Sequence, residues 1–171
     1  MFPAPTSAQV HRPLPALPSP AAVRPPILVP VRRPLLPLAA CAVLLGLPHW
    51  KIQRLVEDGR LQFAFNIATP GARTRALRVL TKSVRDFLAN PGALRSETAD
   101  ELTAELNGLF PPLCLTYSST AVEAVLGCSH QHVKRLVLAG LLAQTKPGTT
   151  GRAAILSRKA CVEFLRSRRI Q

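Results

Sequence analysis

Two segments of the chain share one order of apolar and polar positions. LGLPHWKIQRLVEDGRL (residues 45–61) aligns without a gap with LGCSHQHVKRLVLAGLL (residues 126–142), and eight of the 17 paired residues are identical. In the second segment Val133, Leu136 and Val137 fall at i, i+3 and i+4, a spacing that puts them on one face of a helix. Unrelated segments of this composition would share about one or two residues, so the pattern indicates an internal duplication.

The duplication extends further along the chain. TKSVRDFL (residues 81–88) aligns with RKACVEFL (residues 158–165), at an offset that is four residues shorter. The stretches before these blocks each carry Pro-Gly near the middle, flanked by β-prone or apolar residues, which is typical of two strands joined by a turn. We therefore expect each copy to fold as helix, tight turn, helix, β-hairpin and helix.

The second copy gives the clearer helix boundaries. A first helix from about Ser119 to Leu126 is expected to end at Gly127, because glycine tolerates the left-handed conformation of a helix terminus. Ser129 then caps the second helix. With the apolar stripe buried, four side chains of this second helix face outward: His130, Gln131, Lys134 and Arg135.

The segment between the copies, SETADELTAELNGLF, predicts an amphipathic helix. Thr98 and Glu101 form a capping box, and Leu102, Leu106 and Leu109 form its apolar face. The segment is acidic, so we expect this helix to space or pack the two copies and to repel DNA.

Proline separates the start of the chain from the rest. Residues 1–37 hold 11 of the 17 prolines, four arginines and no acidic residue, a composition that favours an extended, polyproline-like conformation. Such a tail is either a basic arm along phosphates or a passive extension. The predicted organisation is a disordered tail (1–36), a first copy (37–90), a linker (91–117) and a second copy (118–171).

Basic residues dominate the charge. The chain has 22 Lys and Arg against nine Asp and Glu, a net charge of +13. This imbalance predicts a polyanionic partner, nucleic acid first and an anionic membrane surface second. Pro34, Pro37 and Pro48 break the longest apolar run, so we expect no transmembrane helix and no membrane partner. The expected location is cytoplasmic, with the nucleoid.

Four cysteines, Cys41, Cys114, Cys128 and Cys161, lie far apart and form no CxxC pair, which favours buried, reduced thiols. Cys128 and His132 are four apart on one helical face, but no fourth metal ligand follows, so we expect no metal. Paired carboxylates in an apolar setting, a nucleophile elbow and a phosphate-binding glycine loop are all absent from the sequence. We expect no enzymatic activity and no cofactor.

LGCSHQHVKRLVLAGLL, followed by a short hairpin and SRKACVEFL, resembles the excisionase-like winged helix-turn-helix family, relatives of the DNA-binding domain of MerR-type regulators. The shared form is Leu-Gly, a capping Ser, Val followed by Arg-Leu and an apolar residue, and Gly-X-Leu before the hairpin, or wing. It covers residues 118–166 well and 37–89 less well. The first copy has Pro48 at the capping position, and the acids Glu57 and Asp58 end its second helix.

The resemblance implies a mainly α fold with small β-hairpin wings: two tandem winged helix-turn-helix modules joined by an amphipathic helix. In that family the second helix enters the major groove and the wing contacts the adjacent backbone or minor groove. The implied function is a sequence-specific, double-stranded DNA-binding protein of bacteria, either a transcription regulator or an excisionase-type recombination directionality factor. Tandem modules would read two neighbouring half-sites, arranged as direct repeats. Monomer and homo-oligomer both stay open.

The predicted DNA contacts lie on the second helices and the wings. In the second copy they are Ser129, His130, Gln131, Lys134 and Arg135 on the helix, and Lys146, Thr149 and Arg152 on the wing. In the first copy they are His49, Trp50, Lys51, Gln53 and Arg54 on the helix, and Arg73, Arg75 and Arg78 on the wing. Trp50 either wedges against a base or sugar, packs beneath the wing, or contacts a protein.

Two alternatives accompany the DNA-binding hypothesis. The first is a protein-interaction adaptor built on diverged modules, with a partner bound around Trp50 or the linker helix. The second is an exported lipoprotein, because Leu38-Ala39-Ala40-Cys41 has the form of a lipoprotein cleavage box. The repeat alignment instead makes this apolar run the first helix of the first copy, and its prolines interrupt what a signal peptide keeps apolar.

Overall fold

The structure is a computed structural model that describes residues 33–92, 98–147 and 153–170. The described residues form seven helices and two antiparallel three-stranded sheets. The first copy contains β1 (Leu35–Pro37), α1 (Leu38–Leu45), α2 (His49–Glu57), β2 (Ala64–Asn66), β3 (Leu77–Leu80) and α3 (Thr81–Ala89). After α4 (Ala99–Leu109), the second copy contains β4 (Thr116–Ser118), α5 (Ser119–Leu126), α6 (His130–Leu138), β5 (Gln144–Lys146), β6 (Ile155–Ser157) and α7 (Arg158–Ser167).

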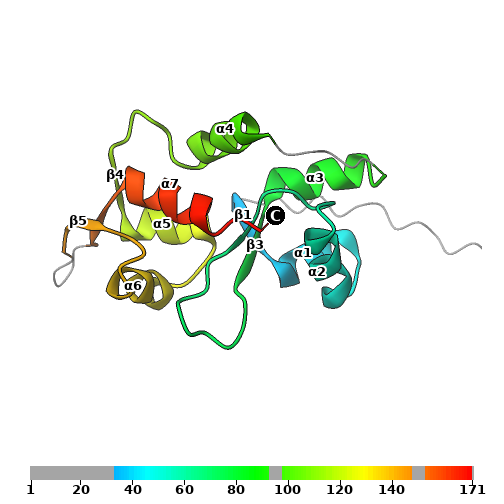
Figure 1. Cartoon of the computed structure of the whole chain (residues 1–171), viewed down its shortest axis with the longest axis horizontal. Coiled ribbons are helices and arrows are strands. Elements are labelled where there is room, and N and C mark those ends of the chain that lie inside the picture. The colour runs from blue at the N-terminus through cyan, green and yellow to red at the C-terminus, as the bar shows by residue number, and fades with distance from the viewer. Residues whose placement is uncertain (1–32, 93–97, 148–152, 171) are drawn as a thin grey trace, which may run out of the picture.

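The duplication is visible in the order of elements, which is strand, helix, helix, strand, strand, helix in both copies. The sheets have matching strand orders, β1-β3-β2 and β4-β6-β5. The two helices, the hairpin and the final helix of each copy are therefore confirmed as elements (Figure 1). Most of the predicted tail, residues 1–32, lies outside the described residues.

Each copy opens with a strand that the sequence pattern does not predict. β1 pairs with β3, with Leu35 opposite Leu80, and β4 pairs with β6. β1 begins at Leu35 and β4 at Thr116, each two residues before the expected start of its copy. Three-residue strands are too short to show an alternating pattern, and their partners lie about 40 residues away along the chain.

The turn between the first two helices of each copy is built as expected. Gly46 ends α1 and Gly127 ends α5, both in the left-handed conformation with φ of 62° and 58°. Ser129 occupies the N-cap position of α6, but its side chain makes no capping hydrogen bond. The backbone carbonyl of Ser129 accepts instead from the N–H groups of His132 and Val133.

The first hairpin consists of β2, β3 and the loop of residues 67–76. Its tip is a turn in which the Ala72 N–H donates to the Thr69 carbonyl, with Pro70 and Gly71 between them. Gly71 has a φ of 76°, as the third position of a type II turn requires. At its base, Asn66 Oδ1 accepts from the N–H groups of Ala68 and Ala76, which holds the loop ends together.

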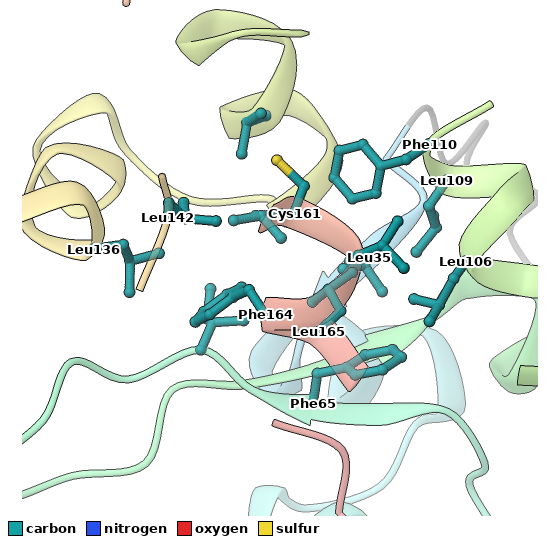
Figure 2. Close-up of a cluster of buried hydrophobic side chains, with 14 of the residues drawn as sticks. Leu35, Phe65, Leu106, Leu109, Phe110, Leu136, Leu142, Cys161, Phe164 and Leu165 are labelled. Carbon is teal, nitrogen blue, oxygen red and sulfur yellow. The ribbon is translucent and has the colours of Figure 1, made fainter. Parts of the chain in front are cut away.

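One apolar core joins the two copies and α4. It contains Leu35 and Phe65 from the first copy, Phe110 from the end of α4, and Leu136 and Phe164 from the second copy (Figure 2). The predicted capping box of Thr98 and Glu101 is confirmed, and the three leucines of the apolar face are buried in this core. α4 therefore packs the copies together. A second, smaller cluster lies within the first copy, where Cys41 is fully buried in α1.

Leu35→Ala is expected to lower the free energy of unfolding by about 2 to 4 kcal/mol, because Leu35 is 0% exposed at the junction of the two copies. Denaturant unfolding followed by far-UV circular dichroism measures this loss. Leu113→Ala is the control, since Leu113 is 97% exposed. Equal stability of the two variants would contradict the placement of residue 35 in the core.

Candidate nucleic-acid interface

The second helix of each copy, the first hairpin and β5 lie on one side of the molecule in Figure 1. In Figure 1, α2, the loop of the first hairpin and α6 follow one another along the lower side, with β5 at the left end. The acidic helix α4 lies on the upper side. The two second helices, which begin 81 positions apart in the sequence, thus lie along the same side of the molecule in this view.

α6 presents the polar face that the sequence predicts. Val133 and Leu136 are buried, whereas Gln131, Lys134 and Arg135 are exposed. Neither cation pairs with an acid among the described residues. Their charges are therefore available to a partner from solution.

His130 does not stand alone on this face. Its Nδ1 lies 2.6 Å from Glu123 Oε1, so the imidazole at the start of α6 bonds a carboxylate of α5. The Glu123 side chain is only 19% exposed, compared with 61% for His130. The pair fixes the turn between the two helices and places a partly buried acid beside the first turn of α6. The sequence does not predict this pair, because it depends on the angle between α5 and α6.

α2 presents a matching but weaker basic face. His49, Lys51 and Arg54 are exposed, while Gln53 is half-buried and donates to Glu57 at 3.1 Å. Trp50 is 64% exposed, so it does not pack beneath the hairpin, and its indole lies open on the first turn of α2.

The first hairpin adds two exposed guanidinium groups. Arg73 and Arg75 are exposed, and Arg75 Nη1 lies 3.8 Å from Glu57 Oε1, a contact between the hairpin and α2. A pocket beside Arg75 is also lined by Arg168 and Arg169 at the end of α7. The sequence does not predict these two arginines beside the first hairpin, because no local pattern relates them to a hairpin some 90 residues earlier.

Arg78 is a correction to the predicted site. It is half-buried in β3 and donates to the carbonyls of Leu126 (3.0 Å), Gly127 (3.1 Å) and Leu77 (2.9 Å). Burial lowers the pKa of Arg78, which nevertheless stays charged near neutral pH. This guanidinium is committed to the junction between the copies and is not a contact for DNA.

The second hairpin is described only in part. Lys146 is exposed in β5, as the prediction requires. Thr149 and Arg152 lie outside the described residues. Seven exposed cations of α2, the first hairpin, α6 and β5 are here called the basic edge: Lys51, Arg54, Arg73, Arg75, Lys134, Arg135 and Lys146.

Cations elsewhere are largely occupied. Lys82 pairs with Glu105 on α4, and Arg166 donates to Thr103 Oγ1 at 3.3 Å. Arg158 donates to the Phe110 carbonyl at 2.7 Å and to Asn107 Oδ1 at 2.5 Å. These contacts hold α4 against α3 and α7. Much of the basic charge remote from the basic edge is therefore structural.

The cysteines differ in accessibility. Burial raises the pKa of Cys41 and Cys161 to about 12 and that of Cys128 to about 11. These three thiols stay protonated near neutral pH, which makes them poor nucleophiles. Cys114 is exposed, so the expectation of buried thiols is wrong for this residue.

Thiol labelling checks this distribution. In the native protein, Cys114 is expected to react with a thiol reagent well before the other three cysteines, and unfolding should make all four reactive. Mass spectrometry of the labelled peptides gives the order. Rapid native labelling of Cys41 or Cys161 would contradict their burial.

His132 of α6 contacts the first hairpin. Its Nε2 lies 2.7 Å from the Ile67 carbonyl of the first hairpin, so this nitrogen acts as the donor. Among residues 33–92, 98–147 and 153–170, no three His, Cys, Asp or Glu side chains are grouped so that they could hold a metal ion. No helix in the same ranges is long and apolar enough to cross a membrane.

Comparisons with known proteins give no relative for this chain. No protein-family model, no curated protein and no solved structure matches this chain.

Proposed function

We propose that this chain is a sequence-specific, double-stranded DNA-binding protein made of two winged helix-turn-helix modules, with a role in transcription regulation or in directing recombination. The order strand, helix, helix, strand, strand, helix in each copy supports the proposal, as does the left-handed glycine between the first two helices. The residues that resemble the excisionase-like family occupy these same elements.

The observation that carries the proposal is the distribution of charge. The basic edge gathers seven exposed cations from both second helices and both hairpins, and only Arg75 among them pairs with an acid in the described parts of the chain. The acids of α4 lie on the other side of the molecule (Figure 1). A cluster of exposed cations of this kind can neutralise phosphates and orient a protein on a duplex.

Each module would use its parts in different ways. α6 and α2 are of a size that fits the major groove, where Arg135, Arg54 and Gln131 can bond base edges. Lys134 and Lys51 would contact phosphates beside the groove, and the arginines of the first hairpin would reach the neighbouring backbone. These roles require no catalytic group and no cofactor.

Selection of bound sequences from a random duplex library tests the proposal. The full chain should enrich a defined sequence, and a footprint on genomic fragments should then fall beside a promoter or an attachment site. Recovery of no preferred sequence would contradict sequence-specific binding. If the protein enriches a sequence but its footprint lies beside neither a promoter nor an attachment site, the proposed role in transcription or recombination is contradicted.

A protein-interaction adaptor is the second candidate, and the exposure of Trp50 favours it. Large aromatic side chains are frequent anchors at protein interfaces. Trp50→Ala in the full chain separates the two functions: lost affinity for the selected duplex places the indole at DNA, whereas unchanged affinity frees it for a protein partner. The full chain is needed because the copies share one core.

A further inference from the structure

The two copies are locked together by specific contacts at their junction. Arg78 from β3 donates to the carbonyls of Leu126 and Gly127, at the end of α5. These are the last residues before the turn into α6. The guanidinium therefore ties the sheet of the first copy to the point that orients the second helix of the second copy.

The same junction is packed without spare room. A Cβ atom on Gly127 would lie 2.7 Å from the backbone oxygen of Leu35, closer than real Cβ atoms approach other atoms. Glycine is thus required there for packing as well as for its φ of 58°. Backbone of β1 and backbone of the α5–α6 turn are in direct contact.

Two further links lie on either side of this point. His132 Nε2 of α6 bonds the Ile67 carbonyl of the first hairpin at 2.7 Å. The end of the chain runs along β2: the Asn66 N–H donates to the Arg168 carbonyl at 2.8 Å, and the Ile170 N–H donates to the Ala64 carbonyl at 2.9 Å. The last residues of the second copy thus extend the sheet of the first.

The order of the parts along the basic edge is also informative. In this view α2, the first hairpin, α6 and β5 of the second hairpin follow one another in that order (Figure 1). The His132–Ile67 contact shows that the first hairpin abuts α6. Along one face of a duplex the grooves alternate as major, minor, major and minor, so the protein repeats the same alternation of helix and hairpin.

We infer that the chain is a single rigid reader of two half-sites in the same orientation, one helical turn apart, with the first hairpin over the minor groove between them. This inference rests on the proposed function and adds the class of DNA target to it. Successive major grooves on one face are about 10 base pairs apart. A rigid junction cannot follow a half-site that rotates to the other face of the duplex.

A series of duplexes tests the spacing with the full chain. Two copies of the selected half-site are placed in direct orientation at centre separations of about 10, 15 and 20 base pairs, beside a duplex with one half-site. The 10-base-pair duplex should bind at least about 10-fold more tightly than the other three, which should be alike. Equal affinity at all spacings, or preference for an inverted repeat, would overturn the inference. Failure to bind any duplex would instead overturn the proposed function.

Arg78→Met tests the junction itself, because methionine keeps the bulk of the side chain and removes its donors. The variant should lose most of the preference for the 10-base-pair spacing and should keep the affinity for a single half-site. Arg85→Met is the matched control, since Arg85 is exposed on α3. An unchanged spacing preference in Arg78→Met would show that this contact does not set the spacing.

Discussion

Replacing Lys134 and Arg135 together by alanine is expected to lower the affinity for the selected duplex by about 100-fold, with the free energy of unfolding changed by less than about 0.5 kcal/mol. Both side chains are exposed on α6, so their removal leaves the core intact. In the proposed binding mode Arg135 would bond a base edge, worth about 1 to 3 kcal/mol, and Lys134 would contact a phosphate. Fluorescence anisotropy at fixed salt measures the affinity.

The matched control is Arg85→Ala with Lys159→Ala, which removes the same charge from exposed positions on α3 and α7. This pair should weaken binding by only a few-fold, through long-range electrostatics. Equal losses from the two double variants would mean that net charge, and not α6, accounts for binding. Unchanged affinity in the α6 variant would move the binding surface elsewhere.

Phe110→Ala is expected to lower the free energy of unfolding by about 3 to 5 kcal/mol, a large share of the roughly 5 to 15 kcal/mol typical of a small protein. The Phe110 side chain is fully buried and makes an edge-to-face contact with Tyr117, with ring centroids 5.2 Å apart. Because Phe110 lies in the core that joins both copies, the loss should reach both. Denaturant unfolding measures the total.

Amide hydrogen exchange shows whether the copies respond together. In Phe110→Ala, protection should fall in α2 and β3 of the first copy as well as in α6 and α7 of the second. Leu115→Ala is the control, since Leu115 is 78% exposed and should leave stability within about 0.5 kcal/mol. Loss of protection in the second copy alone would contradict a shared core.

The helices could be predicted because local spacing encodes them. The stripe of Val133 and Leu136, the glycine at position 127 and the capping box of Thr98 and Glu101 each act within a few residues. The helix boundaries are clearer in the second copy, and the alignment of the two copies gives the corresponding boundaries in the first. The same spacing predicts most of the side chains that are exposed on α6.

The junction could not be predicted, because its contacts join residues far apart in the sequence. Nothing near Arg78 in the sequence distinguishes it from Arg73 and Arg75, yet it bonds carbonyls 48 and 49 residues away. The pairing of His130 with Glu123 depends on the angle between α5 and α6, which no spacing rule supplies. The rigid arrangement of the copies therefore emerged only from the structure.

The rigid arrangement also changes how tandem modules are expected to work. The sequence alone suggests two modules joined by a linker, in which binding of the first module would raise the effective concentration of the second at the DNA. With Arg78, Gly127 and the end of the chain interlocked, the two second helices keep one relative placement. If the proposed function holds, two half-sites would be bound in one event, and the spacing between them would become part of the recognised sequence.

The salt dependence of duplex binding by the full chain tests the central claim most directly. If the seven cations of the basic edge neutralise phosphates, affinity should fall by about 1,000-fold or more between about 50 and 200 mM salt, because bound counterions are released from the DNA. An affinity for duplex DNA that is the same at both salt concentrations would contradict the account.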